Sequence, residues 1–410
     1  MSVGRGRNEH IRDVLVVGGG PVGGQAARLL AEKGHDVLLV EEHKRVGDPV
    51  QCAGLFTPRI FDLVDFPMDR VFLNAVRGAN VHSPNGKTIS LDGGKTMAVA
   101  VDRGQFDREC VQAAEAKGAT VQRGVKAVAA RRDGKDVIVT LRDANGTREE
   151  RTRLLIGADG VQGQVAKWFD LPRAREIIPC YGAQMEGTKL DPQRVEMWVG
   201  QDAAPGFFSW MIPTNADGSE GKVEVGVDIK APKPAQFYYD RMRKHPSSAR
   251  FLRDDAKSCF DICACIPLGP IKKTSAANVA LVGDAAAQTK PTSGGGVYTG
   301  LVCAGHLADV GHAALKDGDL SEKRMAQYHD RWYDDIGREL YVGWRLRKAF
   351  MHLRDDQLDD LFVLLDDPDL LQMVNVMGDI DYPSKLARPL LKKAPHLFKY
   401  SGAFMKSLFD

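Results

Sequence analysis

The sequence lacks the features that would tie it to a membrane interior or to the cell exterior. No apolar run approaches the roughly 18 residues that a membrane-spanning helix requires. The basic segment from Met1 to Arg12 has no apolar stretch and no cleavage site, so we expect no secretory signal there. The 7 cysteines, an odd number scattered along the chain, do not suit a disulfide framework. We therefore expect a cytoplasmic protein in a reducing compartment.

An excess of charge of either sign is also missing. The 56 Lys and Arg residues against 54 Asp and Glu residues leave a net charge of +2, which argues against general nucleic-acid binding. Hydrophobic residues make up 43% of the chain and charged residues 27%, as in folded rather than disordered proteins. With 410 residues, the chain is long enough for two closely packed domains.

The most informative stretch stands near the N-terminus. Asp13–Val17 reads DVLVV, a short apolar run typical of a buried parallel strand. A G-x-G-x-x-G turn follows and leads into an Ala- and Leu-rich helix pattern over residues 25–33; its glycines are Gly18, Gly20 and Gly23. In such turns the first glycine allows the tight bend, the second lets a pyrophosphate approach the backbone, and the third lets helix and strand pack closely. We therefore predict that a dinucleotide places its pyrophosphate at this helix N-terminus.

A second strand pattern, Asp36–Val40, ends at Glu41. An acid at the end of this strand is placed to accept hydrogen bonds from a ribose hydroxyl. Glu41 therefore favours FAD or NAD over NADP.

Two later motifs separate FAD from NAD. The apolar segment Leu154–Gly160 ends in Asp159-Gly160, and Val279–Ala285 contains Gly283-Asp284 ahead of a glycine run at 294–296. A simple NAD dehydrogenase needs neither motif. Together with the N-terminal glycines, they resemble the FAD-dependent monooxygenase-like superfamily, which has the fold of p-hydroxybenzoate hydroxylase. The resemblance implies an α/β protein (α+β overall) with a Rossmann-type FAD-binding domain of that type, and FAD as the cofactor.

The resemblance also implies roles for single residues. Asp284 would hydrogen-bond the ribityl chain of FAD, and three residues would lie beside the isoalloxazine ring: Gly295, Gly296 and Val297. Arg103, in the segment DRGQFD, matches a family segment near the ribityl and phosphate groups, and Ala127 and Asp159 are further expected cofactor contacts. The alternative for Arg103 is a surface charge at a helix start.

Within that superfamily the sequence more closely resembles the geranylgeranyl reductases. Pro49–Leu55, which reads PVQCAGL, resembles their segment beside the flavin, although it is one residue shorter than in some archaeal members. This likeness adds three expected cofactor contacts: Cys52, Ala53 and Gly54.

Pro205–Pro213, which reads PGFFSWMIP, is similar to the P-x-x-Y-x-W-x-F-P substrate-cavity motif of the same family. The tyrosine is Phe208 here and the phenylalanine is Ile212, so a hydroxyl is lost while the apolar character is kept. Phe208, Trp210 and Ile212 are spaced by two and share one strand face. The resemblance assigns that face to substrate binding; the alternative is ordinary sheet core.

The chain divides into three expected parts. They are a discontinuous FAD-binding domain at 10–172 plus 270–320, an antiparallel-sheet substrate domain at 173–269, and a helical C-terminal region at 320–410. Inside the first part, Asp133-Gly134 and Asn145-Gly146 predict hairpin turns and hence a small antiparallel sheet over 120–150. In the second part, strand patterns fall at 181–186, 194–199, 207–212 and 222–228.

The segment Lys385–Lys406 is basic with interspersed apolar residues. Such a mixture can lie on an anionic membrane surface, and a solvated terminal helix pair is the alternative. We expect, at most, a peripheral contact with the cytoplasmic face of a membrane.

Cys259, Cys263 and Cys265 invite a metal site. Odd positions of a strand face one side, but residues two apart lie about 6.6 Å apart along the strand, which is awkward for one ion. We therefore predict a packing role and no metal. Because no cysteine follows Cys303, the four-cysteine iron–sulfur cluster of some membrane-bound flavoproteins is not expected.

The resemblance implies a flavin-dependent reductase that saturates the C=C bonds of geranylgeranyl chains, above all those of archaeal membrane glycerophospholipid precursors. FAD would supply hydride, and the ring faces of Trp210 and Phe208 could stabilise positive charge. Cys52 is the one titratable candidate for catalysis near the flavin, with a structural role as the alternative. The sequence shows no second nucleotide-binding repeat, so reduced ferredoxin or another carrier is an expected electron donor. Three other functions stay open: a flavin monooxygenase or epoxidase, a reductase of quinone or chlorophyll prenyl side chains, and a non-enzymatic carrier.

Overall fold

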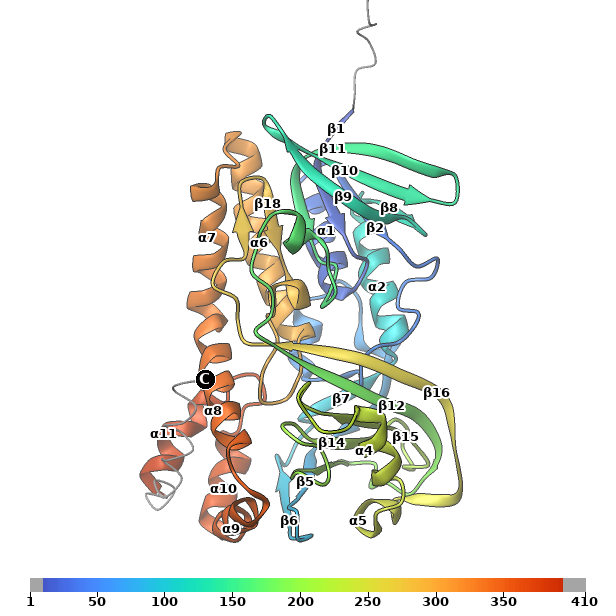
Figure 1. Ribbon diagram of the computed structural model, residues 1–410, viewed down its shortest axis with the longest axis vertical. Helices are drawn as coiled ribbons and strands as arrows, with labels where there is room; N and C mark the ends of the chain where they lie inside the picture. The colour runs from blue at the N-terminus through green and yellow to red at the C-terminus, as the bar shows by residue number, and fades with distance from the viewer. Residues whose placement is uncertain (1–9, 394–410) are drawn as a thin grey trace, which may run out of the picture.

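Two large β-sheets make up the body of the protein, one in the upper and one in the lower half of Figure 1, with helices packed on them. The structure is a computed structural model that describes residues 10–393. The mixed α/β fold agrees with the prediction from the sequence. A third sheet of three short strands lies between the two; its strands are β3 (Leu55–Phe56), β7 (Ala98–Val101) and β4 (Phe72–Val76).

The upper sheet contains the Rossmann-type core. Its main strands are, in spatial order, β17 (Ser275–Ala276), β18 (Val279–Leu281), β11 (Gly146–Gly157), β1 (Ile11–Val17), β2 (Val37–Glu41) and β8 (Thr120–Arg123). β1 pairs in parallel with both β2 and β11, so it lies in the middle of the sheet. Its side chains alternate between two buried faces, Val14 and Val16 on one and Leu15 and Val17 on the other. This double burial explains the uninterrupted apolar run.

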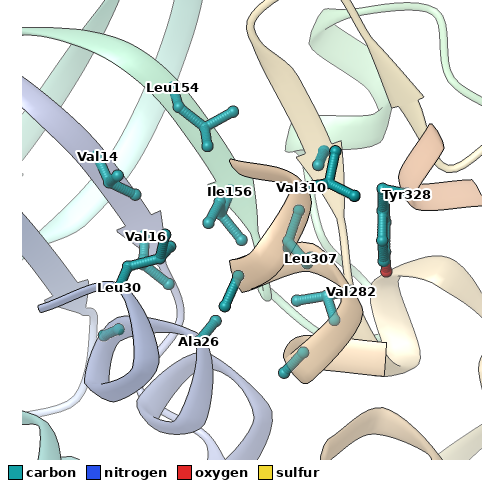
Figure 2. Close-up of a cluster of buried hydrophobic side chains, with 14 of the residues drawn as sticks. Val14, Val16, Ala26, Leu30, Leu154, Ile156, Val282, Leu307, Val310 and Tyr328 are labelled. Atoms are coloured by element: carbon teal, nitrogen blue, oxygen red, sulfur yellow. The ribbon is translucent and has the colours of Figure 1, made fainter. Parts of the chain in front are cut away.

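Two helices cover one face of this sheet. Helix α1 (Pro21–Glu32) follows β1 directly, four residues earlier than the sequence pattern suggested, and α6 (Val297–Asp317) packs beside it. Figure 2 shows side chains from α1, α6, β1, β11 and α7 (Glu322–Trp332) meeting in this core. The core of this sheet therefore joins β1 and α1, near the N-terminus, to α6 and α7, which come after residue 296.

The predicted hairpins form a meander rather than a separate sheet. β9 (Lys126–Asp133), β10 (Asp136–Asp143) and β11 pair antiparallel in turn, with turns at the two expected glycine dipeptides. The last part of β11 then continues into the parallel sheet. One long strand thus belongs to both arrangements, which local turn signals cannot show.

The lower sheet, called here the roof sheet, contains all four strands predicted in the second part. Its order is β16 (Leu252–Leu268), β12 (Glu176–Thr188), β15 (Glu220–Gly226), β14 (Ser209–Pro213), β13 (Arg194–Trp198), β5 (Gly78–His82) and β6 (Thr88–Asp92). The sheet is not wholly antiparallel, because β13 and β5 pair in parallel. We keep the three-part division as a proposal, with β5 and β6 moved to the second part because they pair there.

Helices also stand beside the sheets. α2 (Arg103–Ala116) packs on α1, α3 (Val165–Trp168) follows β11, and α4 (Ala235–Met242) covers the outer face of the roof sheet, followed by α5 (Pro246–Ala249). The predicted helical C-terminal region is present. Its later helices are α8 (Arg338–Met351), α9 (Asp355–Leu365), α10 (Pro368–Met377) and α11 (Ser384–Lys393), at the lower left of Figure 1. In the part of the chain that the structure describes, no helix is long and apolar enough to cross a membrane.

Candidate functional site

A large cavity of about 1190 Å³ extends between the upper sheet and the roof sheet. Typical small-molecule sites measure roughly 300–1,000 Å³, so this cavity has room for more than one drug-sized ligand. It brings together almost every site residue expected from the sequence. The expected residues that line it are Gly18, Gly20, Gly23, Glu41, Cys52, Ala53, Arg103, Ala127, Asp159, Phe208, Trp210, Ile212, Asp284, Gly295, Gly296 and Val297.

Gly54 is the exception. It packs away from the cavity, with a φ of +68°, and a Cβ there would lie 2.7 Å from the carbonyl oxygen of Val101. The expected cofactor contact at Gly54 therefore has no support in the structure, and this glycine serves the turn that leads into β3.

The glycine turn between β1 and α1 opens onto one end of the cavity. Gly18 has a φ of +107°, and a Cβ there would lie 2.3 Å from the carbonyl oxygen of Ala158; at Gly23 it would lie 2.0 Å from that of Gly18. A Cβ on Gly20 would meet no atom within 4 Å. No side chain among residues 10–393 caps the N-terminus of α1. Its first backbone N–H groups are therefore available to an anion.

Acidic side chains follow the ends of three strands in this region. Glu41 accepts hydrogen bonds from the backbone N–H of Gly19 at 2.7 Å and from that of His43 at 2.8 Å. Asp159 Oδ2 accepts from the backbone N–H groups that open α3, while its Oδ1 is buried with no partner among the described residues. Asp284 accepts from Thr289 Oγ1 at 3.1 Å. Burial raises the pKa of both Asp159 and Asp284.

Arg103 is not a surface charge. It begins α2, after the helix cap Asp102, and forms a two-pronged ion pair with Asp107 at 2.9 and 2.8 Å. Its side chain is only 12% exposed. The alternative interpretation of Arg103 is therefore wrong, and a buried cation lies at the cavity wall.

Cys52 is half-buried in the loop before β3, next to the roof sheet. Its Sγ accepts a hydrogen bond from the backbone N–H of Gly54 at 3.4 Å, and its carbonyl oxygen accepts one from Lys222 Nζ at 3.4 Å. Both contacts hold the loop that carries Cys52. These two contacts support a structural role for Cys52, the alternative to a catalytic one.

The roof sheet turns an aromatic and apolar face toward the cavity. Trp210 and Ile212 lie on β14, which begins two residues later than the predicted start at 207, so Phe208 immediately precedes the strand. The ring of Phe208 lies 5.4 Å from that of Trp210 and stacks on Phe207 at 4.1 Å, measured between centroids. Met197 and Val195 of β13 extend the same surface.

Two charged residues on this face were not predicted from the sequence. Glu224 lies opposite Trp210 and Lys222 opposite Ile212 in the pairing of β14 with β15. Both are almost fully buried, and Glu224 lines the cavity. Burial raises the pKa of Glu224 to about 7 and lowers the pKa of Lys222. Charged and apolar residues alternate in the segment Lys-Val-Glu-Val at 222–225, which predicts a strand, but such alternation places the charged residues on the solvent face rather than in a cavity.

The segment that covers one side of the cavity, called here the C-terminal cover, was also not predicted from the sequence. It comprises residues 374–386, and the members that line the cavity are Val374, Asn375, Gly378, Asp379, Ile380, Pro383 and Leu386. Asp381, buried at 1% exposure, anchors it through Lys290 Nζ at 2.5 Å and Thr57 Oγ1 at 2.7 Å. Arg59 adds an ion pair to Asp379 at 3.2 Å. Residues 394–406 of the predicted basic tail lie outside the described residues.

The three strand cysteines do not form the common packing face that their spacing suggested. The pairing of β12 with β16 skips Cys259, which lies in a bulge, and this side chain is exposed. Cys263 is exposed as well, and only Cys265 is half-buried. Within residues 10–393 no three His, Cys, Asp or Glu side chains lie close enough to hold a metal ion.

The residues present fit FAD. The open space beside Gly20 and the uncapped start of α1 suit a pyrophosphate, while the unpartnered oxygen of Asp159 offers an acceptor for a hydroxyl. The cavity then continues past Asp284 and Gly295 to the roof sheet. FAD would therefore occupy the part of the cavity that begins at the glycine turn and leave the apolar part under the roof sheet to a substrate.

The chain matches the model of the FAD binding domain family over residues 12–333. It is 30% identical over 404 residues to digeranylgeranylglycerophospholipid reductase 2 of Methanopyrus kandleri, covering 96% of this chain and 99% of that one. Among solved structures it resembles a geranylgeranyl bacteriochlorophyll reductase-like protein of Thermoplasma acidophilum, with a TM-score of 0.86, 24% identity and coverage of 97% of this chain and 100% of that one.

A more distant fold likeness is to p-nitrophenol 4-monooxygenase of Pseudomonas putida, with a TM-score of 0.70 and 19% identity over 92% of this chain and 98% of that one. The fold is thus shared by reductase-like proteins and monooxygenases. The two sequence matches, each spanning most of the chain, are more specific. The chain belongs to the FAD binding domain family and, within it, to the FAD-dependent digeranylgeranylglycerophospholipid reductases.

Proposed function

We propose that the protein reduces the C=C bonds of geranylgeranyl chains on archaeal membrane glycerophospholipid precursors. The observation that carries the proposal is one continuous cavity. It joins the glycine turn and acids suited to FAD to an apolar sheet face that carries Phe208, Trp210 and Ile212. The name of the Methanopyrus relative, which matches over nearly the whole chain, supports the lipid substrate.

The shape of the apolar end suits a long hydrocarbon. Aromatic and aliphatic side chains of the roof sheet form one wall, and the C-terminal cover adds Val374, Ile380 and Leu386. An isoprenoid chain has no polar groups along its length, so its binding relies on apolar area removed from water. The same lining keeps water away from the reacting bond.

The cofactor and the protein divide the work. When bound and reduced, FAD supplies a hydride. The turn at Gly18–Gly23 and the side chains of Arg103 and Asp284 would hold and orient the cofactor. The roof would hold one C=C bond at a time, and the ring faces of Trp210 and Phe208 would stabilise positive charge that develops on carbon.

A flavin monooxygenase is the second candidate, because the fold is shared with a known monooxygenase. The two functions differ in their need for oxygen. A reductase oxidises its reduced flavin with the prenyl substrate alone, whereas a monooxygenase requires O₂. Anaerobic experiments therefore distinguish them.

The test is anaerobic reoxidation of the FAD-loaded protein after reduction with dithionite. We expect flavin absorbance to return when digeranylgeranylglyceryl phosphate is added, and the recovered lipid to gain two hydrogen atoms for each flavin reoxidised. A prenylated quinone and a chlorophyll prenyl ester serve as alternative substrates. Reoxidation that occurs only after oxygen is admitted would refute the reductase function, and flavin that stays reduced with every substrate would indicate a carrier.

We further propose that the protein meets the membrane at the C-terminal cover. Val376, Met377 and Ile380 are exposed large apolar side chains of the cover, and Val376 is 77% exposed. Ile380 lines the cavity, and Val376 and Met377 stand in the chain between the lining residues Asn375 and Gly378. A lipid precursor in a bilayer could enter between these side chains and the roof sheet. The cations nearby are already paired, since Lys385 binds Asp379 and Lys393 binds Asp369. Apolar contact would therefore dominate the part of this surface that is described. The electron donor, reduced ferredoxin or another carrier, stays a prediction.

A further inference from the structure

One carboxylic acid lies among the apolar side chains of the roof. Glu224 of β15 stands directly opposite Trp210 of β14, and both line the cavity. Glu224 is 2% exposed, and its Oε1 has no hydrogen-bond partner among residues 10–393. Trp210 Nε1 is likewise buried and forms no hydrogen bond of ordinary geometry within that range, but it lies close enough to the carboxyl group of Glu224 to favour the charged form of that group. Since an unpartnered buried polar atom costs free energy, its presence in a ligand cavity points to a use.

The neighbouring strand leaves room for this side chain. Gly182 of β12 pairs with Glu224, and a Cβ at Gly182 would lie 2.4 Å from Glu224 Cγ. Any other residue at position 182 would displace the carboxyl group. The sheet therefore holds Glu224 in one place, as a group that must meet a reacting atom requires.

The electrostatic surroundings favour a carboxyl group that changes charge near neutral pH. Burial raises the pKa of Glu224 to about 7, while Lys222, two residues away on the same face, and the indole N–H of Trp210 oppose the rise. From β12, Cys180 faces Glu224, and burial raises the pKa of its thiol well above the ordinary value, so it stays neutral. Outside the roof sheet, Cys52, Arg103 and Asp102 face Lys222. A group whose pKa is close to the working pH is well suited to general acid catalysis.

We propose that Glu224 is the proton donor of the reduction, delivering its carboxyl proton to one carbon of the prenyl C=C bond. The inference rests on the proposed function. The O–H bond of Glu224 breaks, and the π electron pair of the alkene forms the new C–H bond. The other, more substituted carbon gains a hydride with its two electrons from reduced FAD, which is left oxidised. The alkene thus gains H⁺ and H⁻, and Glu224 becomes a carboxylate.

Two neighbours of Glu224 can stabilise the charges that this proton transfer creates. Positive charge develops on carbon beside Trp210, whose ring face can stabilise it. Negative charge appears on Glu224 beside Lys222, whose ammonium group attracts it. Lys222 is thus a positioning residue, which also binds the loop of Cys52. After the product leaves, the carboxylate regains a proton from solvent in the open cavity.

The test uses full-length, FAD-loaded protein with Glu224→Gln, which keeps the shape but removes the acid. In single-turnover anaerobic reoxidation by digeranylgeranylglyceryl phosphate we expect the rate to fall at least about 100-fold, since general acid catalysis typically contributes 10²–10⁴-fold. FAD content and reduction by dithionite should be unchanged. Glu196→Gln is the matched control, because Glu196 is a buried carboxylate on the opposite face of the same sheet. Glu224→Asp should restore part of the rate.

Two measurements on the wild-type protein need no variant. The reoxidation rate should fall above about pH 7 as Glu224 loses its proton, approaching tenfold per pH unit. Infrared difference spectra of the oxidised protein should show a protonated carboxyl band that disappears over the same pH range. In a folded Glu224→Gln protein that band should be absent.

The outcomes separate the inference from the function. Reoxidation of Glu224→Gln at the wild-type rate would overturn the role of Glu224 and leave the reductase function intact. Wild-type protein that the lipid does not reoxidise would overturn the function itself. If Glu224→Gln does not fold, the wild-type data decide, and a rate or carboxyl band that is independent of pH between about 6 and 8.5 would overturn the inference.

Discussion

Trp210 is the residue at which packing and chemistry meet, because its ring lies beside both Phe208 and Glu224 in the roof. We predict that Trp210→Leu folds and binds FAD but is reoxidised by prenyl substrate about 2- to 30-fold more slowly. This range corresponds to about 0.5–2 kcal/mol of lost cation–π stabilisation. Anaerobic stopped-flow absorbance measures the rate.

Trp198→Leu is the control for that experiment. Trp198 is a buried tryptophan of the same sheet whose side chain lies on the outer face, stacked on His82 at 4.8 Å. It should lower the melting temperature without slowing reoxidation of the loaded protein. Equal reoxidation rates in the two variants would reduce Trp210 to ordinary sheet core.

Gly20 has an equally specific role among single residues. A side chain there meets no protein atom within 4 Å, and the backbone has an ordinary extended conformation, so the fold should tolerate Gly20→Val. The added atoms would instead enter the space suited to a pyrophosphate. We predict colourless, folded protein, assessed by flavin absorbance and circular dichroism. Gly305→Ala, also in open space but away from the cavity, should remain yellow; a yellow Gly20→Val protein would contradict the assignment.

At the scale of elements, the C-terminal cover depends on one buried ion pair. Asp381→Asn would leave Lys290 buried without its counter-charge, which typically costs about 3–5 kcal/mol. We predict faster amide hydrogen exchange in residues 374–386 and a lower melting temperature. The reason is that this pair joins the cover to the loop before α6.

The matched control breaks an exposed ion pair of the same region. Lys87 binds Asp366 at 3.0 Å, and their side chains are 31% and 47% exposed, far more than those of Lys290 and Asp381. Asp366→Asn should cost no more than about 1 kcal/mol. Hydrogen exchange in the cover that is unchanged by Asp381→Asn would show that other contacts hold it.

Local sequence patterns predicted most helices and strands correctly, but they did not predict which of these elements pack against one another. The strand, glycine turn and helix at Asp13–Glu32 could be recognised because their roles follow from adjacent residues. The inward position of Glu224 could not, because it depends on α4, which packs on Val223 and Val225 and turns the alternate residues toward the cavity. The pairing of Lys290 with Asp381 joins residues that no local pattern connects.

At the scale of the whole molecule, the proposed membrane contact predicts how the protein partitions. We expect flotation with liposomes, and reduced flotation of a Val376→Asp, Met377→Asp double variant, because charge on the exposed apolar surface of the cover opposes insertion. Ile229→Asp is the control, since Ile229 is 64% exposed but lies outside the cover. Flotation that survives the double variant but is abolished by salt would assign the contact to the basic tail instead.

The strand order of the upper sheet bears on how the protein is made. β1 pairs with β11, so Ile11 can pair only after Arg151 has been synthesised. β11 in turn pairs with β18, so Leu155 can pair there only after Val279 has been synthesised. Such distant pairings favour slow folding. Gly18 emerges from the ribosome long before Asp284 and Gly296, which line the same cavity. Translation of most of the chain therefore precedes cofactor capture, and a cell short of flavin would accumulate a finished but empty polypeptide rather than a stalled one.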